Sequence, residues 1–331
     1  MTHVGLDIGT NYTKATKDGK EVKIFPSLVA YGEEKDWSLT GESKDVYVGE
    51  EALTIIQSME NVEALRPLHE GRLIHKSYIE LAKHALEILK VKPEVVATGL
   101  PVKSSRKERE ELAADIKSKL GIDVLVFPEP VGTLAYMGID TGVCIDIGFG
   151  TTDMLVLSGM EYLKGDTMLV GVDWLFDNID VIVRNKVGIN ITPEELTNLV
   201  IDENYEIGRI RSGKRITVKH SDIEEDYRRL VKVWVERIAN RIKLMLEGLS
   251  TAIVDNMVIT GGGALLPGVK NEFEDAFREI TEIKTPDRPI EANALGYYKL
   301  AEAIVKSSVK SEAQEIKEDK EDEKKKKGKK K

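Results

Sequence analysis

The stretch Asp146-Ile-Gly-Phe-Gly-Thr-Thr-Asp153 decides the fold. An apolar run at residues 142–145 leads into it, and another at residues 154–157 leaves it. This pattern predicts a strand, a tight glycine turn and a second strand. Gly148 and Gly150 let the backbone turn sharply and bring its N–H groups close to an anion.

The polar residues of this turn favour a nucleotide with a metal ion. Thr151 and Thr152 add hydroxyl donors, and Asp146 and Asp153 lie at the mouth of the turn. An acid beside a phosphate requires a cation between them, because like charges repel each other. A hydrated divalent cation would fit there.

A second copy of this device lies near the N-terminus. Asp7-Ile-Gly-Thr-Asn-Tyr-Thr-Lys14 follows the apolar residues 3–6, and it repeats Asp-Ile-Gly and a Thr six positions after the Asp. Its eighth position is Lys14, where the other copy has Asp153. One glycine hairpin alone is usually only a hairpin. An internal repeat with an Asp in each copy predicts two similar domains that face one nucleotide.

Composition bounds the class of protein. The 331 residues are 41% hydrophobic, which is enough for two globular domains. No apolar run approaches the roughly 20 residues that span a bilayer, and the chain enters a strand at once without a signal peptide. Cys144 is the only cysteine, which excludes internal disulfides and Cys-rich metal sites. We therefore expect a cytoplasmic protein, and the Lys/Glu-rich, Gln-poor usage is typical of a thermophile.

Charge separates the body of the chain from its end. The net charge is −9, although residues 306–331 hold 11 Lys and 7 acids. Without this basic end segment, the rest of the chain is more acidic still, and an acidic surface binds nucleic acid poorly. We therefore expect no direct sequence-specific contact with nucleic acid. The end segment lacks apolar periodicity, which predicts a disordered, solvated tail. Contact of this tail with an acidic partner is the less favoured interpretation.

A strand–helix alternation surrounds the first candidate catalytic residue. Residues 95–101 and 124–127 read as strands around a helix over 106–120, which indicates a mostly parallel α/β sheet. Glu129 follows the second strand, where α/β sheets place their chemistry. Considered alone, Glu129 would be interpreted as a solvated carboxylate in a turn. Because two candidate phosphate-binding hairpins occur in the same chain, a catalytic role is favoured.

A third glycine element follows a long amphipathic helix, which is expected to end at Leu249. Val258-Ile-Thr-Gly-Gly-Gly-Ala-Leu-Leu-Pro-Gly268 predicts a buried strand that ends at Gly261, Gly262 and Gly263, followed by Ala264. Bare backbone lets a flat ring approach closely, which suits the adenosine end of a nucleotide. The alternative interpretation is that these glycines serve only tight packing of the turn and bind no ligand.

The order of these motifs resembles the superfamily of actin, chaperone and sugar-kinase ATPases. Its phosphate-1, connect-1, phosphate-2, adenosine and connect-2 signatures match, in order, residues 7–14, 127–138, 146–153, 258–268 and 288–302. The resemblance implies two RNase H-like α/β domains around a central nucleotide cleft. The implied first domain is 1–141 plus 286–305, with a small subdomain at about 26–70; the second is 142–285, with a small subdomain at about 175–250.

Within the superfamily, residues 66–71, 192–220 and 260–264 resemble ParM-like archaeal actins. This likeness implies ATP hydrolysis coupled to a homopolymer filament, for DNA segregation through an adaptor protein or for cytoskeletal organisation. The implied cofactors are Mg²⁺ and ATP, with GTP left open. A small-molecule kinase of the same superfamily and a non-polymerising nucleotide-binding scaffold remain open alternatives.

The resemblance also assigns roles. Asp7 and Asp146 match the acids that hold Mg²⁺ through water, Glu129 matches the residue that positions the attacking water, and Lys14 matches a phosphate-binding Lys. The other expected nucleotide contacts lie in the three glycine elements: Gly9, Thr10, Asn11 and Tyr12; Gly148, Gly150, Thr151, Thr152 and Asp153; and Gly261, Gly262, Gly263 and Ala264.

Overall fold

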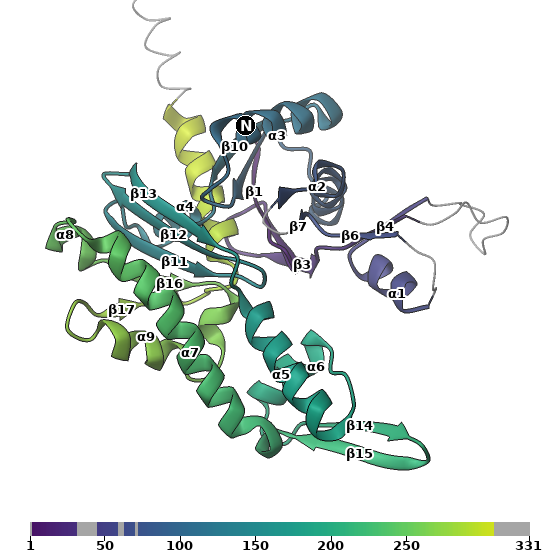
Figure 1. Cartoon of the computed structure of the whole chain (residues 1–331). Coiled ribbons are helices and arrows are strands. Elements are labelled where there is room, and N and C mark those ends of the chain that lie inside the picture. The colour runs from purple at the N-terminus through teal and green to yellow at the C-terminus, as the bar shows by residue number, and fades with distance from the viewer. Residues whose placement is uncertain (1, 32–44, 59–62, 70–71, 308–331) are drawn as a thin grey trace, which may run out of the picture.

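The computed structural model of the chain describes residues 2–31, 45–58, 63–69 and 72–307. Two five-stranded sheets dominate it (Figure 1). The expected tail lies almost wholly outside the described residues, as does part of the small subdomain expected at 26–70. The limits of the expected domains stay predictions.

The first sheet has the strand order β10-β9-β1-β2-β3. The strands β1, β2 and β3 form an antiparallel meander, whereas β9 and β10 continue the sheet in parallel beyond β1. The bounds are β1 His3–Ile8, β2 Tyr12–Thr16, β3 Lys23–Pro26, β9 Val95–Leu100 and β10 Asp123–Pro128.

The second sheet repeats this plan as β13-β12-β11-β16-β17. Its bounds are β11 Gly142–Ile147, β12 Thr152–Ser158, β13 Glu161–Met168, β16 Met257–Thr260 and β17 Ile283–Lys284. The internal repeat is therefore also a structural repeat. The strands predicted at 95–101 and 124–127 are parallel, but the first sheet as a whole is mixed rather than mostly parallel, because the glycine hairpin joins antiparallel strands.

Helices cover both sheets. On the first sheet lie α2 (His75–Leu89) and α3 (Arg106–Leu120), and on the second lie α5 (Val172–Val187), α7 (His220–Leu246), α8 (Thr251–Val254) and α9 (Val269–Phe277). The apolar stripe of α7 buries Trp234 and Ile238 as its periodicity predicts. The helix ends at Leu246 rather than at Leu249, because Gly248 takes a positive φ of 79°.

Smaller elements extend from each half (Figure 1). Beside the first sheet they are β4 (Val29–Tyr31), β5 (Val46–Val48), α1 (Glu50–Ser58), β6 (Glu63–Leu65), β7 (Leu68–His69) and β8 (Arg72–Leu73). Beyond α5 they are α6 (Pro193–Ile201), β14 (Glu206–Arg211) and β15 (Lys214–Lys219), and η1 (Gly262–Leu265) follows β16. Within the described part of the chain, no helix is both long and apolar enough to cross a membrane.

Two helices join the halves. The helix α4 (Pro130–Met137) packs on Cys144 and Leu155 of the second sheet, and the helix over residues 292–307 packs on Ala97 of the first. They cross backbone to backbone: a Cβ on Gly296 would overlap the carbonyl of Gly132. Glu129, just before α4, and Asn293, within the helix over residues 292–307, therefore lie between the two sheets.

Candidate functional site

The two glycine turns face each other across the space between the sheets. The N–H of Gly148 donates to the carbonyl of Thr151 at 2.9 Å, and the N–H of Gly9 donates to that of Tyr12 at 3.2 Å, so both turns are tight. A Cβ on Gly150 would lie 3.4 Å from the side chain of Thr10. One turn from each sheet thus borders a shared opening, as the repeat predicts.

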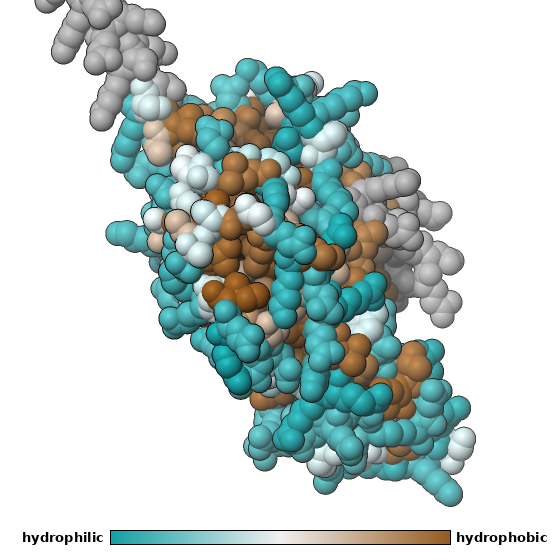
Figure 2. Space-filling model, turned by 60° about the vertical axis from the view of Figure 1, so that its left-hand side comes forward, coloured by the Kyte–Doolittle hydropathy of each residue, from teal (hydrophilic) through white to brown (hydrophobic). Residues whose placement is uncertain are grey.

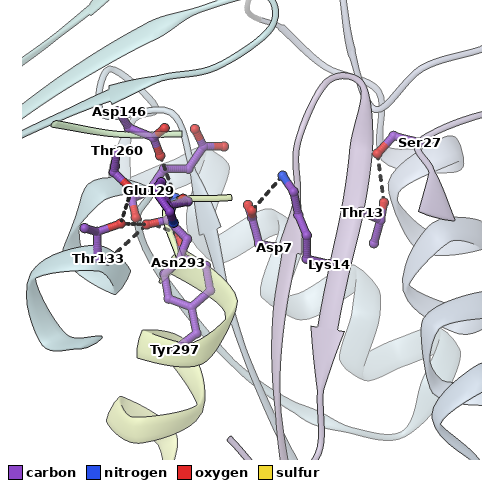
Figure 3. A network of polar contacts seen from close by, with 11 residues as sticks. Asp7, Thr13, Lys14, Ser27, Glu129, Thr133, Asp146, Thr260, Asn293 and Tyr297 are labelled. Carbon is purple, nitrogen blue, oxygen red and sulfur yellow. Dashed lines mark hydrogen bonds and ion pairs between the residues drawn. The ribbon is translucent and has the colours of Figure 1, made fainter. Parts of the chain in front are cut away.

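Buried carboxylates flank this opening, and the two copies hold them differently. Asp7 and Lys14 are cross-strand neighbours in the first hairpin and form an ion pair at 3.0 Å. The equivalent neighbours in the second hairpin are Asp146 and Asp153, two acids. Figure 3 shows Asp7 with Lys14 on one side and Asp146 on the other. The first hairpin is neutralised internally, and the second is not.

Burial and the excess of negative charge together raise the pKa values of two of these acids, Asp146 and Glu129. Burial, followed by the charge of Asp7, raises the pKa of Asp146 to about 7, although a hydrogen bond from Asn293 opposes the shift. Burial also raises the pKa of Glu129 well above its usual value, with Asp153 and Asp7 adding to it. Burial works against the charge of Lys14, but the neighbouring acids, Asp7 first, leave its pKa raised. One lysine does not offset these carboxylates, so the opening suits a further cation.

The donor set fits magnesium rather than a metal held by protein alone. Among the residues that the structure describes, no group of three or more His, Cys, Asp or Glu side chains is placed to hold a metal ion. Mg²⁺ commonly keeps several waters and binds through one or two carboxylates and the phosphates of a substrate. Asp7 and Asp146 match that need.

We expect Asp146→Asn to stabilise the protein in buffer without metal or nucleotide. The pKa of Asp146 is raised on folding, so ionisation of this group costs stability as the pH rises from its unfolded pKa near 4 through about 7. At pH 8 the amide should raise the free energy of unfolding by a few kcal/mol, on the order of 1.4 per pKa unit. Urea unfolding at pH 8 and at pH 4.5 checks this, because the gain should shrink at the lower pH. An equal gain at both values would contradict it.

A network from the second joining helix holds Asp146 in place. The amide of Asn293 donates to Oδ2 of Asp146 at 2.6 Å, and its oxygen accepts from the N–H and the hydroxyl of Thr133 at 3.0 and 2.8 Å (Figure 3). The sequence motif covered Asn293 without giving it a role. Its one available signal was an amide within an apolar helical segment, Ala292 to Leu295.

Glu129 lies at the start of α4, directly after β10. Its N–H donates to the carbonyl of Leu100 at 2.9 Å, and its own carbonyl accepts from the hydroxyl of Tyr297 at 2.8 Å. A Cβ on Gly99 would overlap the hydroxyl of Tyr297 and lie 3.1 Å from Cγ of Glu129, so the bare backbone leaves room for both side chains. The main chain of Glu129 is therefore fixed from both sides.

The threonine hydroxyls of the second turn donate to groups of the protein itself. The hydroxyl of Thr152 donates to the carbonyl of Val170 at 2.6 Å, and that of Thr151 donates to Asp153 at 3.1 Å. Asp153 also accepts from the N–H of Val102 at 2.7 Å and from Thr167 at 2.6 Å. These side chains tie β12 to its surroundings, and their contact with a phosphate stays a prediction.

The residues of the first turn are held by an arginine for which the sequence predicted no role in the nucleotide site. Arg66 donates to the carbonyl of Thr10 at 3.0 Å and to Oδ1 of Asn11 at 3.1 Å. Tyr12 is 44% exposed, and Lys14 lies over Gly9, whose Cβ would be 3.2 Å from Nζ. Side chains at positions 11 and 14 are thus oriented by Arg66 and Asp7.

The four residues of the glycine-rich element, 261–264, form two pairs with different surroundings. Gly261 has φ +85°, and a Cβ there would overlap Oδ1 of Asp146, which places this glycine beside the carboxylates. Gly262 faces open space, with no heavy atom within 4 Å of its Cβ position. Gly263 packs against Ile147, and Ala264 belongs to the core. Only the first two suit direct contact with a ligand.

Another acid near the opening was missed. Asp173, in the first turn of α5, accepts from the N–H of Trp174 at 2.7 Å and from that of Gly171 at 3.2 Å. Burial raises its pKa, and one of its oxygens lies 3.8 Å from the Cβ position of Gly150. It therefore occupies the N-terminal end of α5, beside the second glycine turn.

The chain is similar to known proteins over most of its length. The chain is 26% identical to the cell shape-determining protein Mbl of Bacillus subtilis over 88% of this chain and 93% of that protein. It is also 26% identical to an archaeal actin homolog of Thermoplasma volcanium over 91% of this chain and 99% of that protein. The ADP-bound crystal structure of MreB5 of Spiroplasma citri superposes with a TM-score of 0.76 at 22% identity, covering 93% of this chain and 98% of that one. A double helical filament structure of MamK gives 0.75 at 19%, covering 91% and 98%.

These findings confirm the actin-like fold and the superfamily that the five motifs indicate. They do not support the narrower likeness to ParM, because the family whose model matches is described as MreB/Mbl protein. That match runs over residues 1–309. The chain belongs to the MreB/Mbl family.

Proposed function

We propose that this chain binds MgATP between its two glycine turns, hydrolyses it, and couples hydrolysis to assembly into filaments. One observation carries the proposal. Asp7, Asp146 and Glu129 lie at the opening where turns from both sheets meet: the charges of Asp7 and Asp146 add to the raised pKa of Glu129, and the charge of Asp7 adds to that of Asp146. Such clusters of perturbed groups mark functional sites.

Each group has a role in this proposal. Asp7 and Asp146 hold Mg²⁺ through water, and the ion offsets phosphate charge when bound. The N–H groups of both turns and the ammonium of Lys14 meet the phosphates. Glu129 orients the attacking water and accepts its proton. Positioning and electrostatics of this kind supply most of the catalysis in phosphoryl transfer.

The names of relatives support a cytoskeletal role. MreB5 has been solved with ADP and with AMPPNP, MamK has been solved as a filament, and Mbl is a cell shape-determining protein. We therefore propose a cytoplasmic filament of this chain with itself as the main partner. No observation on the described residues favours a DNA adaptor, and the choice between ATP and GTP stays open.

Sedimentation tests the proposal. Centrifugation with ATP, with ADP and without nucleotide should give a pellet that depends on nucleotide, together with release of phosphate. The Mg²⁺ dependence should appear when EDTA is added to the ATP sample. Release of phosphate without any pellet would retain the ATPase and remove the filament. Failure to bind nucleotide would overturn both.

A further inference from the structure

The helix over residues 292–307 contacts two acids that have different roles in the proposed function. Its residues Asn293 and Tyr297 are four positions apart, so their side chains leave the same face of the helix about one turn from each other. The amide of Asn293 reaches Asp146, and the hydroxyl of Tyr297 reaches the main chain of Glu129 (Figure 3). One helix therefore holds an acid of the second sheet and an acid that directly follows the first sheet.

The orientation of the Asn293 side chain is fixed by Thr133. The side-chain oxygen of Asn293 accepts from the main-chain N–H of Thr133 at 3.0 Å, and a main-chain N–H only donates. The hydroxyl of Thr133 donates to the same oxygen at 2.8 Å. The amide nitrogen must then face Asp146, to whose Oδ2 it donates at 2.6 Å. Thr133 thus orients Asn293, and Asn293 orients the carboxylate.

The other oxygen of Asp146 lies against main chain. A Cβ on Gly261 would overlap Oδ1 of Asp146, so bare backbone leaves room for this oxygen. The N–H of Gly261 and the hydroxyl of Thr260 both donate to the carbonyl of Pro289, at 3.3 and 3.0 Å. Contacts from β16 and from the last helix therefore give the carboxylate of Asp146 one defined orientation.

Tyr297 holds the start of α4. Its ring is fully buried and stacks on that of Phe127, with 6.3 Å between the ring centroids. Burial, followed by the charges of Asp7 and Glu129, raises the pKa of Tyr297 well above its usual value, so its hydroxyl keeps the proton. This hydroxyl donates to the carbonyl of Glu129 at 2.8 Å, and the N–H of Gly132 donates to the same carbonyl at 3.2 Å. The backbone that carries Glu129 is therefore tied to the last helix.

Glycines on two neighbouring elements make room for this pair. A Cβ on Gly132 of α4 would overlap the main chain of Asn293 and the ring of Tyr297, and a Cβ on Gly99 of β9 would overlap the hydroxyl of Tyr297. Neither Asn293 nor Tyr297 belongs to the molecular surface, which is largely hydrophilic on the face that Figure 2 shows. The two side chains therefore act on the interior of the molecule and not on a partner at its surface.

We infer that Asn293 and Tyr297 are positioning residues that set the spacing between Asp146, which holds Mg²⁺ through water, and Glu129, which orients the attacking water. Four residues of a helix span about 6 Å along its axis. Because both contacts come from one helix, the two acids keep a fixed separation although they belong to different halves of the molecule. A displacement of about 1 Å in a reacting site can lower a rate by about 100-fold. The inference rests on the proposed function and deepens it.

Asn293→Ala should change the Mg²⁺ requirement of nucleotide binding. Without its donor, the carboxylate of Asp146 is no longer oriented toward the ion. The Mg²⁺ concentration for half-maximal binding of a fluorescent ATP analogue should rise by about 10–100-fold, which is typical for the loss of a group that orients a metal ligand. Asn178→Ala is the matched control, because it removes a hydrogen bond of 2.7 Å to the carbonyl of Trp174 in α5. Its Mg²⁺ requirement should equal that of the wild type.

Thr133→Val tests the same contact with a near-isosteric change. It removes the hydroxyl that orients Asn293 and keeps the main-chain N–H. The Mg²⁺ requirement should rise by a smaller factor, about two- to fivefold. This variant decides the question if Asn293→Ala does not fold, because an unchanged requirement in Thr133→Val would overturn the role of Asn293.

Tyr297→Phe should change turnover instead. It removes one hydroxyl and keeps the ring on Phe127 and the second donor to the carbonyl of Glu129. ATP hydrolysis should slow by about tenfold, the equivalent of one hydrogen bond, with the Mg²⁺ requirement and the nucleotide affinity unchanged. Tyr298→Phe is the matched control at the next position, where the ring lies 4.5 Å from that of His3. It should behave as the wild type does.

The outcomes separate the inference from the proposed function. If the wild type binds no nucleotide in the presence of Mg²⁺, the proposed function and the inference both fail. If the wild type binds and hydrolyses ATP but Asn293→Ala and Tyr297→Phe behave as it does, the inference alone fails. It also fails if each variant loses Mg²⁺ affinity and turnover in equal measure, because residues that only stabilise the fold would act in that way. Urea unfolding without metal or nucleotide measures that stability independently.

Discussion

Glu129→Gln should lower the rate of ATP hydrolysis by about 100-fold or more, with nucleotide affinity nearly unchanged. The amide keeps the size of the side chain but cannot accept a proton from water. The main-chain contacts of Glu129 with Leu100 and Tyr297 involve no carboxylate, so they should survive the change. Phosphate release and binding of a fluorescent ATP analogue measure the two effects separately. Unchanged turnover would remove Glu129 from the mechanism.

The pH profile adds a second measurement on the same pair of proteins. Burial, and after it the charges of Asp153, Asp7 and Asp146, raise the pKa of Glu129 well above its usual value. Only the ionised carboxylate accepts a proton, so the wild-type rate should increase as the pH rises through that elevated pKa. The residual rate of Glu129→Gln should lack this rise. Glu161→Gln, at an exposed position at the start of β13, should retain the wild-type profile.

Gly296→Ala should destabilise the protein by about 1–3 kcal/mol or more, even though alanine is the better helix former. The added Cβ would overlap the carbonyl of Gly132, and a backbone atom cannot rotate away as a side chain can. The helix over residues 292–307 would have to move, and with it Asn293 and Tyr297. We therefore expect a loss of ATP turnover together with the loss of stability.

Urea unfolding with an internal control tests this crossing. Gly262→Ala places the same methyl group where no heavy atom lies within 4 Å, so it should leave the free energy of unfolding nearly unchanged. A stable Gly296→Ala protein would show that the two joining helices are not in backbone contact. A loss of turnover in Gly262→Ala without a loss of stability would instead indicate contact of this glycine with the nucleotide.

The parts of the fold that follow local rules were predictable. The two Asp-Ile-Gly turns and the long helix with its apolar stripe depend on neighbours in the sequence, and the structure contains them. It was harder to predict which strands of each sheet pair in parallel and which pair antiparallel, because pairing between β1 and β9 joins residues about ninety positions apart. Sequence periodicity does not encode that choice.

Side-chain partners were the least predictable part of the site. Thr152 is predicted as a phosphate donor in a glycine turn, but its hydroxyl donates a hydrogen bond to the carbonyl of Val170, which only the folded sheet brings near. Asn293 reads as one polar residue in a helix, but it touches Asp146 from 147 positions away. In each case the sequence showed a polar residue but could not predict its hydrogen-bond partner, because tertiary contacts determine that partner.

The difference between the paired hairpins has a consequence for how a ligand enters. Two halves with the same strand order would form a pseudosymmetric receptor, in which a molecule could dock equally well in two opposed directions. Lys14 opposite Asp7 and Asp153 opposite Asp146 remove that degeneracy. The uneven charge across the opening should then favour one direction of docking for a ligand whose own charge is uneven.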